Sequence, residues 1–337
     1  MACNATTKTE NAICWIGIMS RGDKDKMNKV IIDIQRIEFV ITNACTSKCK
    51  HCSLGSLEAV GESINAEAAV NMIKRVTSKY AVESLMTFGG EPLLYADTVC
   101  KIHSTARDCG IADLSIITNG FFTRDKRKIE SVAEAICASG VNDILLSVDA
   151  FHQEYAPIEL VLHFARSLLD NGFLGLCAHP AWLVDEHHDN PYNNETKRLL
   201  KIFNDIGIES PGSNIISPGG NAIKYLGEYF PPPGEIDLSI PCGQVPYTSK
   251  LDEIRAISIE PNGDLAICDS IGNIYKDDVL KILNGYDPYA SPEIQALMEG
   301  GAGGLLEYAR SIGVEVDTTD CYTSCMVCKK IMSALKI

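Results

Sequence analysis

Three cysteines with the spacing CxxxCxxC follow an apolar run near the start of the chain. They are Cys45, Cys49 and Cys52. Three thiolates in one short loop can hold three corners of a [4Fe–4S] cube and leave the fourth iron open, whereas electron-transfer clusters usually take four cysteines. An open iron can bind a ligand and support chemistry. A zinc site that borrows His51, or three unrelated thiols, would also be compatible with this spacing.

A second group of cysteines lies after residue 240. Four thiolates suit either zinc or another [4Fe–4S] cluster, and the spacing does not decide between them. The final CxxC pair also occurs in thioredoxin-like proteins, but no βαβ unit begins around it here. We therefore expect a second metal centre, drawn from Cys242, Cys268, Cys321, Cys325 and Cys328.

Three short polar motifs stand where predicted strands end. In the first, paired glycines let the backbone approach a ligand closely, and Glu91 can accept a hydrogen bond from an ammonium group. The carboxyl ends of parallel strands carry the active sites of α/β barrels, although capping of the local loop explains each polar side chain equally well. The candidate residues are Gly89, Gly90, Glu91, Thr118, Asn119, Ser147 and Asp149.

Two ionisable residues, His152 and Glu154, directly follow the last of these motifs. They offer acid–base chemistry near neutral pH and could face a substrate. Solvated polar residues at the start of a helix are the simpler interpretation, which we prefer at this point.

The elements that must position these residues alternate along the chain. From residue 36, short β-type runs are followed by helical patterns, which predicts a parallel sheet with helices outside, either open or closed into a full or partial barrel. A proline-rich break at residues 231–233 indicates a boundary, and a hairpin with its turn at residues 260–264 follows. The expected strands are residues 36–42, 84–89, 114–118, 143–149, 173–177, 213–217, 254–259 and 265–268; the expected helices are 65–80, 95–109, 126–139, 157–171 and 194–206.

The composition limits the class of partner. The 337 residues include 44 Asp and Glu but 30 Lys and Arg, a formal charge of -14. Nucleic-acid binding depends on Lys and Arg that neutralise phosphates, so we expect no nucleic-acid partner. No apolar run reaches the roughly 18 to 20 residues that span a bilayer, and the short apolar stretch at residues 12–19 is a poor secretion signal. We expect a cytoplasmic protein without a membrane partner.

Together these motifs resemble the radical S-adenosylmethionine (SAM) superfamily, from about Ile37 to the C-terminus. The resemblance implies that Cys45, Cys49 and Cys52 bind a [4Fe–4S] cluster whose open iron is chelated by SAM. It also implies that the turn at residues 89–91 holds the amino group of SAM. His51 takes the place of a residue that is usually aromatic and lies near the adenine. The resemblance further suggests Thr118, Asn119, Ser147 and Asp149 as contacts of the ribose and carboxylate of SAM.

The implied fold is α/β. A partial (β/α)6 TIM-like barrel of the radical SAM type is expected at residues 36–225, after an N-terminal extension at residues 1–35. A small α+β domain is expected at residues 226–337. This last part looks like the Twitch or SPASM extension of radical SAM proteins, which carries auxiliary clusters.

The cysteines after residue 240 are too few for a full SPASM extension, so one auxiliary [4Fe–4S] cluster fits better. The usual Twitch pattern combines a hairpin pair with a terminal CxxC. It implies that Cys321 is left free, either as an alternative ligand or as a thiol that donates a hydrogen atom to a substrate radical, as in related peptide epimerases. The implied ligands are Cys242, Cys268, Cys325 and Cys328.

The resemblance implies a radical SAM oxidoreductase that cleaves SAM reductively and abstracts hydrogen from a substrate. A ribosomally synthesised peptide is the leading substrate, with epimerisation, thioether formation or carbon–carbon cross-linking as the outcome. A small-molecule dehydrogenase is the alternative. An electron donor such as flavodoxin or ferredoxin is the expected partner. In another class, a non-catalytic iron–sulfur electron carrier or a zinc-binding protein remains open; an electron carrier would normally complete each cluster with a fourth cysteine.

Overall fold

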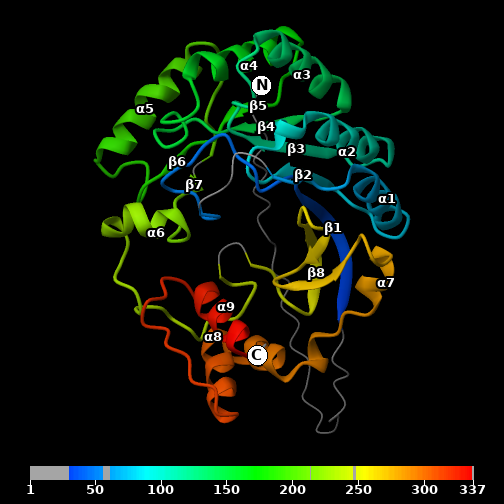
Figure 1. The fold of residues 1–337 in the computed structure, drawn as a ribbon, viewed down its shortest axis with the longest axis vertical. Helices are drawn as coiled ribbons and strands as arrows, with labels where there is room; N and C mark the ends of the chain where they lie inside the picture. Colours follow the sequence, from blue (N-terminus) through cyan, green and yellow to red (C-terminus); the bar gives the residue numbers. More distant parts are fainter. Residues whose placement is uncertain (1–29, 56–60, 213, 246–247, 336–337) are drawn as a thin grey trace, which may run out of the picture.

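A parallel sheet with helices on one side forms the larger part of the molecule (Figure 1). The computed structural model describes residues 30–55, 61–212, 214–245 and 248–335. Adjacent strands β1 to β5 run parallel, and the intervening helices lie in an arc around them. The strands are β1 (Ile31–Val40), β2 (Ser84–Phe88), β3 (Asp113–Thr118), β4 (Asp143–Leu146) and β5 (Leu176–Ala178); the helices are α1 (Ala66–Thr77), α2 (Ala96–Asp108), α3 (Lys126–Ser139), α4 (Ile158–Asp170) and α5 (Pro191–Asn204).

A short second sheet of two parallel strands follows β5. Two residues separate the end of β5 from strand β6 (Ala181–Trp182), and β7 (Asn214–Ile215) pairs with β6 in parallel. This arrangement confirms the predicted α/β class with a parallel sheet. The carboxyl ends of the strands meet at one edge, as required for an active site there.

The C-terminal part begins by extending the main sheet. Strand β8 (Glu253–Ile259) pairs in parallel with β1, and β9 (Asp264–Ala266) and β10 (Ser270–Asn273) follow as antiparallel neighbours. The strand predicted from Arg36 begins five residues earlier, at Ile31, because its first residues pair with β8. A local pattern does not reveal a partner more than 200 residues away in sequence.

The remaining helices lie mostly after the parallel strands in sequence. Helix α8 is kinked at Gly301, whose φ of 61° suits glycine, and a Cβ there would lie 2.6 Å from the carbonyl oxygens of Leu238 and Ile240. The remaining elements are α6 (Asn221–Leu226), α7 (Val279–Asn284), α8 (Pro292–Ser311) and α9 (Ser324–Leu335), with 3-10 turns η1 (Pro92–Tyr95), η2 (Gly227–Tyr229) and η3 (Pro288–Ala290).

Three apolar cores stabilise the described residues, and two of them account for most of the packing. The larger core fills the space between the parallel sheet and α1 to α5, and it continues into β8, β9 and α7 through residues such as Ile257 and Leu283. The second core lies between α8 and α9 and includes Leu305, Cys321 and Ile331. The predicted domain boundary near residue 225 coincides with the end of α6 and stays a prediction, since the main core extends beyond it.

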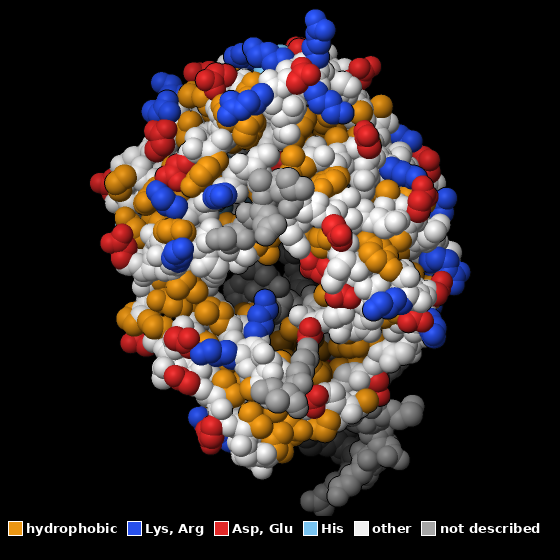
Figure 2. Space-filling model, in the orientation of Figure 1, with side chains coloured by type: hydrophobic (Ala, Val, Ile, Leu, Met, Phe, Trp, Pro, Cys, Tyr) orange, Lys and Arg blue, Asp and Glu red, His pale blue; other side chains and the backbone are white. Residues whose placement is uncertain are grey.

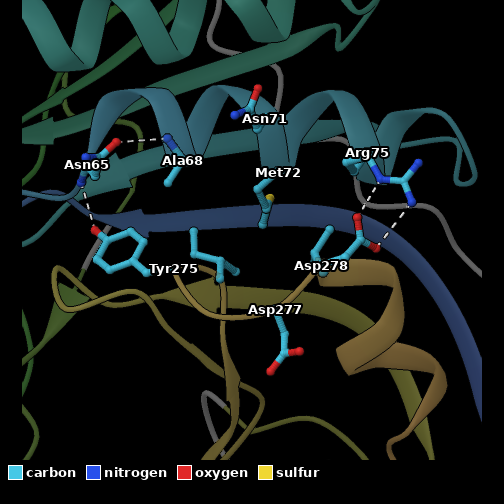
Figure 3. A pocket seen from close by; sticks show the side chains of 10 residues that line it. Asn65, Ala68, Asn71, Met72, Arg75, Tyr275, Asp277 and Asp278 are labelled. Carbon is cyan, nitrogen blue, oxygen red and sulfur yellow. Dashed lines mark hydrogen bonds and ion pairs between the residues drawn. The ribbon is translucent and has the colours of Figure 1, made fainter.

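A polar seam joins α1 to the segment before α7 (Figure 3). The Arg75 guanidinium pairs with both carboxylate oxygens of Asp278, at 2.7 and 3.3 Å. The Tyr275 hydroxyl accepts from the Asn65 N–H and donates to the carbonyl oxygen of Pro261. A cavity of about 350 Å³ remains along this seam. Its walls include the residues that join α1 to the segment before α7, and none of the described residues that line it is a cysteine or histidine.

Within the described residues, no helix combines the length and the apolar character needed to cross a membrane.

Candidate active site

The loop after β1 brings the first three cysteines together at the carboxyl edge of the sheet. The Cys52 N–H donates to the carbonyl oxygen of Cys49, which closes a turn. Burial raises the pKa of Cys45 to about 11 and raises the pKa of Cys49 further, and the other thiols of the loop add to both shifts. Three thiolates this close are costly without a cation, so the loop is suited to a positively charged metal centre.

These thiols open into a cavity of about 550 Å³. The lining comes from the cysteine loop and from the ends of β2, β3 and β4, together with β6 and β7. No fourth cysteine and no Lys, Arg, Asp or Glu is among the described residues that line it. The space-filling view shows a hollow at the centre of one face of the molecule (Figure 2). Among the predicted site residues, those that line the cavity are Cys45, Cys49, His51, Cys52, Gly89, Gly90, Thr118, Asn119 and Ser147.

The paired glycines after β2 hold the cysteine loop as well as lining the cavity. The Gly90 N–H donates to the carbonyl oxygen of Thr42, and the Glu91 N–H donates to that of Ala44, both at 2.8 Å. A Cβ at Gly90 would lie 2.0 Å from the Ala44 oxygen, and one at Gly89 would lie 2.6 Å from the Thr42 oxygen. Glycine is therefore required here for backbone-to-backbone packing.

The Glu91 side chain lies behind the cavity rather than in its wall. It is fully buried, and its carboxylate accepts from the Thr118 hydroxyl at 2.7 Å and from the Leu93 and Asn119 N–H groups at 2.9 Å. Burial raises the pKa of Glu91 to about 7, although these hydrogen bonds oppose the shift. Glu91 thus ties the ends of β2 and β3 together. Its predicted contact with SAM stays a prediction.

The polar residues after β3 face the cysteines. The Asn119 side-chain nitrogen lies 3.8 Å from the sulfur of Cys45 and 3.3 Å from the Ser47 hydroxyl. The Asn119 carbonyl oxygen accepts from the Phe121 N–H at 2.7 Å, which fixes the orientation of the amide. Asn119 is therefore positioned to donate to the sulfur of Cys45, and its role in binding SAM stays a prediction.

The carboxylate after β4 is buried and orients a histidine. Asp149 accepts from the Phe151 and His152 N–H groups, from the Ala181 N–H at 3.1 Å and from Nδ1 of His152 at 2.8 Å. Burial alone would raise the pKa of Asp149, but His152 holds it below its usual range. Burial likewise opposes the charged form of His152, yet Asp149 raises the pKa of that imidazole. The predicted SAM contact of Asp149 stays a prediction.

His152 lines the cavity. The interpretation preferred from the sequence, a solvated polar residue at the start of a helix, is therefore wrong for this residue. Only 17% of its side chain is exposed. His179 also lines the cavity, and no sequence pattern singled it out. The sequence signal that could have placed His152 in the site is its position three residues after Asp149 at the end of a strand. This spacing lets the Asp149 carboxylate reach Nδ1 of His152.

His51 lies against His152, with ring centroids 4.8 Å apart, and against Phe151 at 5.0 Å. Burial lowers the pKa of His51 to about 4, so its ring is neutral near pH 7. The buried Nδ1 of His51 has no hydrogen-bond partner among the described residues. This orphaned atom on the cavity wall is consistent with a bound ligand that supplies the partner, as expected for a residue near the adenine of SAM.

The second cysteine group is also brought together, although its members come from distant segments. Burial raises the pKa of Cys242 to about 11 and that of Cys328 to about 12, and in both cases neighbouring thiols of the group add to the shift. Burial and Cys325 likewise raise the pKa of Cys268. Cys242, Cys268, Cys325 and Cys328 thus lie close enough for their thiols to influence one another's pKa values.

Cys321 stands apart from these four thiols. It is 1% exposed within the apolar core of α8 and α9, and its sulfur contacts the Asp320 carboxylate. After burial, the charged groups that shift its pKa are Asp320, Lys330 and Asp317, with no cysteine among them. Cys321 does not line the cavity of the first three cysteines. Its predicted role as a hydrogen-atom donor is untested.

The separation of the sulfurs bears on which metal centre fits. Tetrahedral zinc with Zn–S bonds of about 2.3 Å would hold its sulfurs less than about 4 Å apart. Among the described residues, one group of three ligand atoms lies within 4.8 Å of one another, formed by Cys49, His51 and His152. The four C-terminal thiols form no such group, and neither do the three thiols of the first loop. The auxiliary [4Fe–4S] cluster stays a prediction, with zinc as the alternative.

These observations define an enzyme site with three clustered thiols at the carboxyl edge of a parallel sheet. A sequence profile described as the radical SAM superfamily matches residues 39–221, which is more than half of the chain. The chain belongs to the radical SAM superfamily and is a radical SAM enzyme, with SAM and a [4Fe–4S] cluster as the cofactors of that class.

Curated relatives include enzymes named as GTP 3′,8-cyclases. The chain is 27% identical to a probable GTP 3′,8-cyclase of Methanocaldococcus jannaschii over 154 residues, which cover 44% of this chain and 48% of that protein. It is 31% identical to the GTP 3′,8-cyclase of Vibrio vulnificus strain YJ016 over 145 residues, 41% of each protein. The matched region thus spans less than half the length of these relatives.

Similar solved structures also include SAM-bound proteins. One is native anSMEcpe with bound AdoMet, with a TM-score of 0.49 and 14% identity over 89% of this chain and 96% of that one. Another is Streptococcus suis SuiB bound to S-adenosylmethionine, with a TM-score of 0.41 and 15% identity over 78% of this chain and 67% of that one.

Proposed function

We propose that this radical SAM enzyme modifies a ribosomally synthesised peptide, by epimerisation, thioether formation or carbon–carbon cross-linking. The observation that carries the proposal is the character of the cavity. Its described lining has no Lys, Arg, Asp or Glu, and it includes the exposed apolar side chains of Leu54 and Ile215, which are 58% and 50% exposed. An uncharged cavity with apolar side chains at the surface suits a peptide segment.

The same lining disfavours a nucleoside triphosphate, although relatives are named as GTP 3′,8-cyclases. A triphosphate carries several negative charges, and proteins recognise phosphates with Arg, Lys or rows of backbone N–H groups. None of the described residues of this cavity supplies a cationic Lys or Arg side chain. His152 is the group with a raised pKa there, and Asp149 already balances its charge.

We assign Cys45, Cys49 and Cys52 as the ligands of the SAM-binding cluster. When bound, the cluster supplies the electron that cleaves SAM to methionine and a 5′-deoxyadenosyl radical. The chain's own residues orient the reactants and exclude water. In this proposal the turn at residues 89–91 with Thr118 and Asn119 forms one wall of the SAM site, and His51 with Ser147 forms the other. Asp149 acts through His152.

We assign Cys242, Cys268, Cys325 and Cys328 as the ligands of an auxiliary [4Fe–4S] cluster in a Twitch-like C-terminal domain. The support is the influence of these thiols on one another's pKa values and the position of Cys321 outside the group. In this proposal a reductant such as flavodoxin or ferredoxin delivers electrons to the enzyme.

A small-molecule dehydrogenase is the second candidate, favoured by one observation. The Asp149–His152 pair resembles the paired groups that accept protons in hydrolytic enzymes, because the carboxylate binds Nδ1 and His152 lines the cavity. Such a pair could accept the hydroxyl proton of an alcohol undergoing oxidation. A non-catalytic electron carrier is disfavoured because three cysteines, without a fourth, open into a cavity.

The deciding experiment is anaerobic incubation of the reconstituted protein with SAM, reductant and separate panels of peptides, GTP and alcohols. Mass spectrometry would follow both 5′-deoxyadenosine and substrate products. Conversion of a peptide, absent in a variant with Cys45, Cys49 and Cys52 all changed to Ala, supports the proposal. Conversion of GTP or an alcohol alone would contradict it.

A further inference from the structure

The turn that follows β7 reaches back to the cysteine loop, more than 160 residues earlier in the chain. The Asn221 side-chain nitrogen donates to the carbonyl oxygen of Cys49 at 3.1 Å and to that of Gly55 at 3.3 Å. Its backbone N–H donates to the carbonyl oxygen of Cys52 at 2.9 Å. One residue thus binds three carbonyl groups of the loop, two of which belong to cluster ligands.

The residue before Asn221 makes this approach sterically possible. Gly220 has a φ of 50°, and a Cβ there would lie 2.5 Å from the carbonyl oxygen of Ser53 and 2.7 Å from that of Cys52. Any larger residue would push the turn away from the loop or strain the backbone. The backbone of the turn therefore packs directly on the backbone of the cysteine loop.

Apolar packing holds the two segments together around these hydrogen bonds. Asn221 is 6% exposed. The next residue, Ala222, is fully buried and belongs to one apolar cluster with Cys49 and Ile216. Because the Asn221 amide is buried, breaking its bonds would leave buried donors and loop carbonyls without partners, which is unfavourable. The loop conformation is thus coupled to the end of the barrel.

We propose that Asn221 is a positioning residue that sets the conformation of the cluster-binding loop, with Gly220 providing the space it needs. This inference rests on the assignment of Cys45, Cys49 and Cys52 as cluster ligands. Asn221 is not among the described residues that line the cavity, and these hydrogen bonds go to carbonyl oxygens rather than to a sulfur. It acts by holding the carbonyl groups of Cys49 and Cys52, so that their side chains point toward the cavity before metal binds.

The first test uses the metal-free protein and is therefore independent of activity. Asn221→Asp keeps the shape of the side chain but removes both amide donors. Hydrogen exchange at the Cys52 and Gly55 N–H groups, which close the turns of the loop, should accelerate at least tenfold. The matched control is Asn193→Asp, since the buried Asn193 amide holds the carbonyls of another loop, those of Leu183, Asp185 and His188.

The control variant should lose protection at its own loop and leave the cysteine loop at the wild-type rate. Equal exchange at the cysteine loop in Asn221→Asp and wild type would overturn the proposal. Equal acceleration in both variants would also overturn it, because the effect would then be general loosening of the fold.

The second test uses the protein loaded with iron. In Asn221→Asp, the first cluster should bleach in air at least fivefold faster, and its electron paramagnetic resonance spectrum with SAM should differ from wild type. The rate of 5′-deoxyadenosine formation should fall at least tenfold, with the thermal midpoint no lower than that of Asn193→Asp. An unchanged spectrum and rate would show that the contact does not position the cluster.

Gly220→Ala tests the steric part separately. It should reproduce the loop exchange and bleaching effects while Asn221 is intact. Gly172→Ala is the control for backbone strain, because Gly172 has a φ of 78° with no atom within 4 Å of its would-be Cβ. If Gly220→Ala and Gly172→Ala change loop exchange and cluster bleaching equally, backbone strain explains the change. The close packing of Gly220 on the cysteine loop would then not be its cause, and the proposed role of Gly220 would be wrong. Failure of wild type to cleave SAM would instead refute the proposed function, and the metal-free exchange data would still decide the role of Asn221.

Discussion

The side-chain amide of Asn119 donates toward the sulfur of Cys45, with nitrogen and sulfur 3.8 Å apart. Asn119 lies at the end of β3, whereas Cys45 lies on the loop after β1, so the contact bridges two strand ends of the sheet. Hydrogen bonds to cluster sulfurs stabilise the reduced, more negative state and raise the reduction potential. This residue is therefore placed to tune the first cluster.

We expect Asn119→Asp to lower the reduction potential of the first cluster by about 60 mV or more, which corresponds to ~1.4 kcal/mol for a one-electron couple. The substitution keeps the oxygen that accepts from the Phe121 N–H but removes the donor to Cys45 and adds negative charge. A redox titration followed by electron paramagnetic resonance measures the change. The control is Asn142→Asp, since Asn142 lies just before β4 and its amide binds backbone groups of Ala112 and Leu114 beside the start of β3. A similar shift of the reduction potential in this variant would rule out a specific effect of Asn119.

The two cysteine groups predict two independent clusters. The reconstituted protein should bind about eight irons, on the expectation of two four-iron clusters. Changing Cys45, Cys49 and Cys52 to Ala should remove half of them. Changing the four C-terminal ligands should remove the other half. Iron and zinc analysis of each variant makes the measurement, and stoichiometric zinc in place of the second set of irons would contradict the auxiliary cluster.

Cys321→Ala should keep the full iron content, because Cys321 lies outside the four-thiol group. If Cys321 donates a hydrogen atom to a substrate radical, the variant should consume SAM without finishing the product. Wild type in deuterated water should then place one deuterium on the substrate. Since Cys321 is buried in an apolar core, Cys321→Ser tests whether any loss comes from packing alone. Full product formation by Cys321→Ala would exclude the donor role.

Glu91 should make the SAM-free protein less stable as pH rises. Its folded-state pKa of about 7 lies above the ordinary value of 4.5, so the folded state binds the proton more tightly than the unfolded state. The stabilisation is fully present below about pH 4.5 and is lost as pH rises through 7. The shift corresponds to about 3 kcal/mol. Comparing urea unfolding of wild type and Glu91→Gln at pH 5 and pH 8 measures it. If the difference in free energy of unfolding between wild type and variant were the same at both pH values, the raised pKa of Glu91 would be contradicted.

Removing the imidazole beside Asp149 should be destabilising. His152→Ala leaves a buried carboxylate without its cationic partner, and we expect a loss of about 3 kcal/mol near pH 5.5. Asp149 has a lowered pKa, so its contribution is present above its unfolded pKa and lost as pH falls. His152 has a raised pKa, so its contribution fades as pH rises through that value. The double variant with Asp149→Asn should recover part of the loss in urea unfolding; no recovery would argue against the pair.

The sequence by itself determined the features that depend on short-range spacing. The interval between Cys45, Cys49 and Cys52 indicates a loop that can hold a cluster, whatever the rest of the fold. The alternation of apolar runs predicted β1 to β4 and their helices, because each burial pattern is set within a few residues. Helix α3 was predicted at residues 126–139, the bounds that the structure has. Polar residues at strand ends were found by the same reasoning, since parallel strands share one carboxyl edge.

Only the tertiary structure decided what those polar residues contact. Glu91 and Asp149 have the chemistry of ligand-binding groups, yet both are fully buried and hold neighbouring segments in place. His152 became part of the cavity because Asp149 turns its ring, and Asn221 became important because the chain folds back onto the cysteine loop. Likewise, the separation of Cys321 from four other thiols depends on how α8 and α9 pack. These contacts join residues far apart in sequence, so no local pattern carries them.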